Sequence, residues 1–223
     1  IQACALLPDT KSSTRYTMFD APYLTAAFKT AGVTAQVLNA QADPQRQKSQ
    51  ADQCLASGAK VILLDQLDPA SGAAITNDAV GQGAKVIVYD RLVVHRKASS
   101  YVSFDNVKVG KLQAQAVFAV KPKGNYAIIK GNSADPNADF LKSGMDEVIG
   151  DAVKSGDIKI VGETYTDNWD PANAQKEMEQ ILTKNDNKVD AVRAENDGMA
   201  GGFVGARTAQ GLAGSLPVSG QDG

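Results

Sequence analysis

The chain alternates short apolar, β-branched runs with stretches of helical periodicity along its whole length, and this alternation restricts the folds open to it. Segments with the character of strands lie at residues 3–8, 34–40, 59–65, 84–90, 125–131, 158–164, 189–195 and 216–222. Strands with continuous apolar centres that alternate with helices are typical of parallel sheets covered on both faces. The sequence therefore predicts an α/β fold with parallel sheets.

The segment 171–184 carries the clearest helical pattern, because its apolar residues recur at i, i+4, i+7 and i+8. Asp170 and Pro171 stand at its start, as a capping residue followed by a residue suited to the first helical turn. A second helix is expected at 106–120. A short strand just before it marks a break, so we expect a first lobe at 1–107 and a second at 108–223, joined by a short hinge.

Composition narrows the function classes. The net charge is −2 and the basic residues are scattered, which does not indicate nucleic-acid binding. No apolar run reaches the ~18 residues of a membrane span. No signal peptide is visible, so either the protein is cytoplasmic or a targeting segment was removed before residue 1. Cys4 and Cys54 are either two small buried residues or one disulfide, and a disulfide would imply an oxidising compartment.

Polar side chains gather where the expected strands end, which is where ligands bind in open α/β sheets. Carboxylates, carboxamides and arginines suit the hydroxyl groups of a sugar, because Asp accepts hydrogen bonds, Arg donates them and Asn does both. Tyr16 and the single tryptophan, Trp169, offer aromatic faces for the apolar side of a sugar ring. The alternative is that the strand-end Asp and Asn residues only cap the helices that follow.

Several longer stretches resemble the periplasmic xylose-binding proteins, which are type I sugar-binding proteins of ABC transporters. They are "YDR" at 89–91, "YVSFDNVKVGKLQAQA" at 101–116, "GNYAIIKGNSADPNA" at 124–138, "DNWDPANAQKEMEQIL" at 167–182, "AENDGMAGG" at 194–202 and "SGQD" at 219–222. The likeness covers essentially the whole chain, in order and with similar spacing. Each motif alone is weak, but together they are specific.

The resemblance implies two Rossmann-like lobes of the type I periplasmic binding protein fold, with a sugar pocket in the cleft between them. The C-terminal part of the family fold is absent from this chain, which is either a fragment or a shorter relative. The ligand-binding residues implied by the motifs are Arg15, Tyr16, Asp90, Arg91, Asp135, Asn137, Trp169, Asn196 and Asp222. Tyr16 is expected to stack opposite Trp169, and Asp90 and Arg91 to be partly satisfied by each other.

Three positions depart from the family pattern. Lys130 and Asn132 flank a position where the family is richer in small residues, and Glu195 replaces a small residue before Asn196. Glu195 is therefore expected to add a charge near the pocket.

The resemblance implies high-affinity binding of a monosaccharide, xylose or a similar aldose such as glucose, and its delivery to the permease subunits of an ABC transporter by lobe closure. The alternative is a periplasmic sensor that signals through a membrane histidine kinase or chemoreceptor. The expected protein is a monomer in the periplasm or outside the cell, with membrane contact through the permease or a lipid anchor. No nucleic-acid partner is expected.

No enzyme activity, cofactor or metal is expected. His95 is the only histidine, has no evident catalytic partner and is expected on the surface. Asp90 and Asp222 could flank a glycosidic bond, but nothing in the sequence tunes either as an acid. The glycine-rich segment 198–206 does not give the G-x-G-x-x-G of a dinucleotide site.

Overall fold

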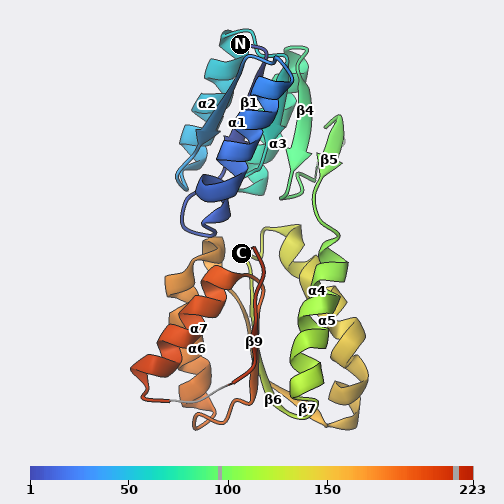
Figure 1. The fold of residues 1–223 in the computed structure, drawn as a ribbon, viewed down its shortest axis with the longest axis vertical. Coiled ribbons are helices and arrows are strands. Elements are labelled where there is room, and N and C mark those ends of the chain that lie inside the picture. Colours follow the sequence, from blue (N-terminus) through green and yellow to red (C-terminus); the bar gives the residue numbers. More distant parts are fainter. Residues whose placement is uncertain (95–96, 213–215, 223) are drawn as a thin grey trace. The chain divides into compact units, whose positions relative to one another are not determined.

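A computed structural model describes residues 1–94, 97–212 and 216–222, and it divides into two compact units, Ile1–Phe104 and Asp105–Gly223. Each unit is an α/β layer structure built on its own parallel sheet (Figure 1). His95, expected on the surface, lies outside the described residues. Among the residues that are described, no helix is both long and apolar enough to cross a membrane.

Unit 1 holds a five-stranded sheet in the order β2-β1-β3-β4-β5, and every neighbouring pair is parallel. Its strands are β1 (Ala3–Leu7), β2 (Ala35–Asn39), β3 (Val61–Leu64), β4 (Lys85–Tyr89) and β5 (Ser100–Val102). Its helices are the π-helical turn η1 (Tyr16–Asp20), α1 (Ala21–Thr30), α2 (Pro44–Ala56) and α3 (Pro69–Gly81). The parallel direction brings the ends of β1, β3 and β4 to one edge of the sheet.

Unit 2 holds a four-stranded parallel sheet in the order β7-β6-β8-β9. Its strands are β6 (Gly124–Lys130), β7 (Ile158–Tyr165), β8 (Ala191–Ala194) and β9 (Val218–Ser219). Its helices are α4 (Asn106–Val120), α5 (Pro136–Ser155), the 3-10 turn η2 (Asp167–Trp169), α6 (Pro171–Lys184) and α7 (Asp197–Ala209). Helices α4 and α5 lie on one side of this sheet, and α6 and α7 on the other (Figure 1).

Local capping explains where several helices begin. Helices α2, α3, α5 and α6 each start with proline preceded by an aspartate whose side chain accepts a backbone N–H of the first turn. Such a cap satisfies backbone donors that have no partner within the helix. The predicted start of α6 at Asp170 and Pro171 is thus confirmed, and so is the α/β fold with parallel sheets.

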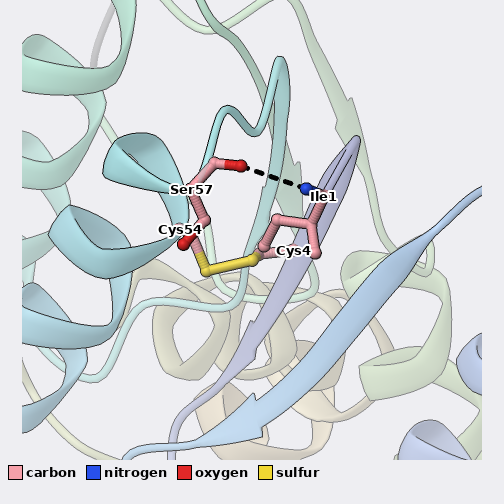
Figure 2. Close-up of a disulfide and its surroundings, with 4 residues drawn as sticks. All are labelled: Ile1, Cys4, Cys54 and Ser57. Atoms are coloured by element: carbon pink, nitrogen blue, oxygen red, sulfur yellow. Dashed lines mark hydrogen bonds between the residues drawn. A yellow bond between two sulfur atoms is a disulfide. The ribbon is translucent and has the colours of Figure 1, made fainter.

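The open question about the cysteines is resolved in favour of a disulfide. Cys4 on β1 and Cys54 on α2 are bonded, as Figure 2 shows, and both are buried. Beside this link, the amino group of Ile1 donates a hydrogen bond to the carbonyl oxygen of Ser57 at 3.0 Å. The first strand is therefore tied to the end of α2 both covalently and by a hydrogen bond.

Candidate functional site

In unit 1, Asp90 lies directly after β4 and collects donors from the loop after β1. Its Oδ2 is 3.0 Å from Nη2 of Arg15 and accepts a hydrogen bond from the Tyr16 hydroxyl at 3.3 Å. Arg15 also uses its Nε to bind Asp20 Oδ2 at 3.0 Å. The Arg15 guanidinium is thus held between two carboxylates, which fixes its orientation before any ligand arrives.

The backbone of Asp90 is in the left-handed region, with φ of 58°. That conformation costs a residue other than glycine roughly 1–3 kcal/mol, and it persists only where the surroundings enforce it. Here the carbonyl oxygen of Asp90 accepts hydrogen bonds from the Tyr101 hydroxyl and Ser103 Oγ, both at 2.9 Å, and its N–H donates to Val102 at 2.9 Å. The segment that includes β5 therefore holds Asp90 in an unusual backbone conformation, as is common at ligand sites.

Arg91 has partners in the segments that follow β1 and β3, and its expected partial pairing with Asp90 stays a prediction. Its Nη2 lies 3.4 Å from Asp9 Oδ2 and 3.2 Å from Ser12 Oγ, and its Nε lies 3.9 Å from Asp65 Oδ1. Asp9 in turn accepts the backbone N–H of Ser12 at 2.7 Å. Asp9 follows β1 and Asp65 follows β3, and both reach Arg91 because these strands end at the same edge of the sheet.

Tyr16, which the sequence predicts to stack on the sugar, lies between the two arginines of unit 1. Its side chain is buried, and the guanidinium carbons of Arg15 and Arg91 lie 5.0 and 5.8 Å from its ring centroid. Burial raises the pKa of Tyr16 well above its usual value, more than the charge of Arg91 lowers it. The Tyr16 hydroxyl thus donates a hydrogen bond to Asp90, and its ring makes cation–π contacts with both arginines.

In unit 2, Trp169 lies in η2 just after β7 and is held on two sides. Its Nε1 donates a hydrogen bond to Asp135 Oδ2 at 3.2 Å. Its six-membered ring lies against Gly131, because a Cβ at that glycine would be 2.2 Å from Cη2 and from Cζ2. Asn168 and Trp169 both have positive φ, of 57° and 55°. Two consecutive residues in this conformation again mark a segment whose geometry is imposed by its surroundings.

Asp135 and Asn196 are helix caps, as the structural alternative supposed. Asp135 Oδ1 accepts the N–H of Asn137 at the start of α5, and Asn196 Oδ1 accepts the N–H of Met199 in α7. Asn137 accepts a hydrogen bond from Asn106 Nδ2 at 2.9 Å. Capping fixes the rotamers of these side chains at the sheet edge and leaves their ligand role a proposal. Asp222 follows β9 and has φ of 84°.

The unusual residues of unit 2 are paired. Glu195 Oε1 is 2.7 Å from Arg193 Nη1, and Lys130 Nζ is 2.9 Å from Glu163 Oε1 and 3.5 Å from the ring centroid of Tyr165. Burial raises the pKa of Glu195 to about 7, although Arg193 and the N–H of Gly131 act in the opposite direction. The charge expected from Glu195 is therefore largely compensated by Arg193.

Sequence reasoning missed several residues that shape the site. No sequence motif marks Asp20 or Ser12. Asp20 contacts Arg15 and Ser12 contacts Arg91 only because the segment after β1 folds back on itself and onto the end of β4. Gly131 had a readable signal: it is a glycine directly after a buried strand, where close backbone approach is common. Within the described residues, no cluster of His, Cys, Asp and Glu could hold a metal ion.

Comparisons with known proteins identify the family of this chain. The family model for the periplasmic binding protein domain matches residues 4–223. The D-xylose-binding periplasmic protein of Escherichia coli is 40% identical over 191 residues, which are 86% of this chain and 58% of that protein. The D-xylose-binding periplasmic protein of Haemophilus influenzae is 47% identical over 132 residues, 59% of this chain and 40% of the relative.

Among solved structures, an ABC transporter solute-binding protein from Clostridium phytofermentans with bound β-D-glucose superposes with a TM-score of 0.91 at 28% identity. That match covers all of this chain and 73% of the other chain. The matches cover 58% and 40% of the two D-xylose-binding relatives, so the chain spans less than two thirds of the length of the relatives that it matches. The family model extends over both sheets and the strand-end residues described above, and the chain belongs to the periplasmic binding protein domain family.

Proposed function

We propose that this chain binds a monosaccharide, xylose or a similar aldose such as glucose, for delivery to an ABC-type transporter. Two observations together carry the proposal. Charged and aromatic side chains are held at the strand ends of both sheets, and the chain is 40% identical to a D-xylose-binding protein. The proposed binding residues are Arg15, Asp90, Arg91, Asp135, Asn137, Trp169, Asn196 and Asp222, with Tyr16 as a support.

The chemistry of unit 1 supports recognition of a neutral polyol. Arg15 and Arg91 donate from guanidinium groups already oriented by carboxylates, and Asp90 accepts. Hydrogen bonds with a charged partner contribute roughly 1.5–3 kcal/mol each. Groups that are ordered before binding lose less conformational entropy when a ligand arrives. A few such bonds and one aromatic contact can supply the about −8 kcal/mol of micromolar binding.

We further propose that one sugar contacts residues of both units and favours a closed conformation by its differential contacts with the two states. The disulfide between Cys4 and Cys54 supports a location in the periplasm or outside the cell, because disulfides persist in oxidising compartments.

Isothermal titration calorimetry of the complete gene product against xylose, glucose and other aldoses tests the binding proposal. We expect micromolar binding of at least one aldose and loss of most of that affinity in Trp169→Ala, with the fold retained by circular dichroism. Absence of binding to every pentose and hexose would refute the proposal. Unchanged affinity in Trp169→Ala would show that the tryptophan is not a ligand contact.

Deletion of the gene separates delivery from sensing. Delivery predicts that the deletion strain loses uptake of the labelled sugar at micromolar concentration. Retained uptake together with a lost transcriptional or chemotactic response to the sugar would instead indicate a sensor.

A further inference from the structure

Gly131, the first residue after β6, joins three parts of unit 2. Its N–H donates a hydrogen bond to Glu195 Oε2 at 2.8 Å. Its carbonyl oxygen accepts the N–H of Thr166 at 3.1 Å, and Thr166 lies between β7 and η2. Its α-carbon lies against the indole of Trp169, with no room for a Cβ. The position of the Gly131 backbone therefore determines where the Trp169 ring rests.

The acceptor of the Gly131 N–H belongs to a buried polar network. Glu195 and Arg193 are almost wholly inaccessible. Arg193 binds Glu195 Oε1 at 2.7 Å through Nη1 and Gln113 Oε1 at 2.8 Å through Nη2. Gln113 comes from α4, and its Nε2 reaches the carbonyl oxygens of Ala194 and Glu195 at 3.4 and 3.5 Å. The network thus ties the end of β8 to α4 and aims one carboxylate oxygen at Gly131.

A buried ion pair is a poor device for stability alone, because the cost of removing both charges from water offsets most of their attraction. Well-packed apolar residues at the same positions are often as stable. The pair does, however, orient a carboxylate, and a charged acceptor forms a stronger hydrogen bond to a backbone N–H than a neutral one does. The geometry therefore favours a role in positioning over a role in stability.

We propose that Glu195, oriented by Arg193, is a positioning residue for the aromatic wall of the sugar site: it holds the Gly131 N–H and thereby the seat of Trp169. The inference rests on the proposed function for its consequence on sugar affinity. Its structural part, the control of the Trp169 environment by Glu195, can be measured without any sugar.

The charges that face Glu195 are Arg193 on β8 and Lys130 at the end of β6, and Gln113 from α4 is neutral. Burial raises the pKa of Glu195 to about 7 against the influence of both cations. Protonation near neutral pH therefore turns a charged acceptor into a neutral one. The hold on Gly131 weakens as the pH falls through this range, and the environment of Trp169 should change with it.

Two double variants isolate the hydrogen bond from the ion pair. Arg193→Met with Glu195→Gln removes both charges and keeps an acceptor for Gly131, whereas Arg193→Met with Glu195→Leu removes the acceptor as well. Trp169 is the only tryptophan among residues 1–223. Subtracting the emission of a Trp169→Phe variant therefore isolates its signal and its quenching by acrylamide. Both variants and the wild type are studied as the complete gene product, with urea unfolding to confirm that each is folded.

We expect the Gln variant to show the emission that the wild type reaches when Glu195 is protonated, because both offer the Gly131 N–H a neutral acceptor. The Leu variant should show red-shifted, more readily quenched emission and about tenfold weaker sugar binding, because a buried N–H loses its acceptor. Equal emission and equal affinity in the two variants would overturn the proposal. If the wild type binds no sugar but the emission still differs between the variants, the proposed function fails and the positioning role stands.

A pH titration gives a second measurement, which does not need the Leu variant to fold. Between about pH 5.5 and 8.5 we expect the wild-type Trp169 emission to titrate and the emission of the Gln variant to stay constant. A flat wild-type profile, or an identical titration in the Gln variant, would show that Glu195 does not control the tryptophan.

Discussion

Breaking the Cys4–Cys54 disulfide should destabilise unit 1 strongly and leave unit 2 unchanged. The two cysteines are 50 residues apart in sequence. In the chain-entropy model, a cross-link that closes a loop of this length stabilises the fold by about 4 kcal/mol, between the values for 15-residue and 100-residue loops. Removal of the bond in Cys4→Ala with Cys54→Ala, or its reduction, should therefore lower the free energy of unfolding of unit 1 by about this amount.

Urea unfolding followed by two signals can localise the effect. Circular dichroism reports both units, whereas the fluorescence of Trp169 reports unit 2, because the chain has no other tryptophan. Small domains unfold in urea with a slope of about 2 kcal/mol per M, so a loss of about 4 kcal/mol corresponds to a midpoint lower by about 2 M. We expect this shift in the dichroism transition and an unchanged fluorescence transition.

The control is the double alanine variant, whose unfolding should not respond to reductant. A wild-type dichroism midpoint that moves by less than about 0.5 M on reduction would refute the entropic argument, since it corresponds to only about 1 kcal/mol. A shift of equal size in the fluorescence transition would show that the stability of unit 2 depends on the integrity of unit 1.

Three further changes test other parts of the site. Asp90→Asn should weaken sugar binding and alter the preference among aldoses, because Arg15 and Tyr16 lose a charged acceptor; a calorimetric panel of aldoses measures both effects, and an unchanged panel would remove Asp90 from the site. Gly131→Ala should displace the indole, since its Cβ would lie 2.2 Å from the ring; a red shift of the Trp169 emission is expected, and wild-type emission would contradict the packing. Because the pKa of Glu195 is raised, the folded state binds a proton more tightly than the unfolded state, and the free energy of unfolding should fall as the pH rises from about 4.5 to about 7. In urea unfolding, Arg193→Met with Glu195→Gln should reduce this dependence of the free energy of unfolding on pH. An equal dependence in the variant and the wild type would show that Glu195 does not cause it.

Much of the fold was readable because its determinants are local. Apolar runs predict the strands, and the Asp-Pro pairs that open four helices are capping signals within two adjacent residues. The π-helical turn at Tyr16–Asp20 had no such signal. It depends on how the loop after β1 arranges Arg15 and Tyr16 around Asp90, which is a tertiary contact across 74 residues of sequence.

The candidate site was readable as a set of residue types, but its pairings were not. Asp90 and Arg91 directly follow a predicted strand, so the sequence predicts that both lie at the edge of the sheet. Because the two residues are neighbours in the sequence, each is expected to neutralise part of the charge of the other. Asp90, however, leaves the strand with a positive φ of 58°, so the strict alternation of an extended strand does not continue through it. The structure shows Arg15 beside Asp90 and Asp9 beside Arg91, both contributed by the segment after β1.

The two charged residues that depart from the family pattern, Lys130 and Glu195, each lie beside an opposite charge. Positions 193 and 195 are two residues apart, so an extended backbone places both side chains on one face. The carboxylate of Glu195 therefore lies beside the guanidinium of Arg193. Lys130 is likewise matched by Glu163 on the neighbouring strand β7. Each unusual charge in unit 2 thus has an opposite charge within 3 Å. These charges are therefore compensated within unit 2, and the effect of Glu195 is better sought in the hydrogen bond that it accepts from the Gly131 N–H.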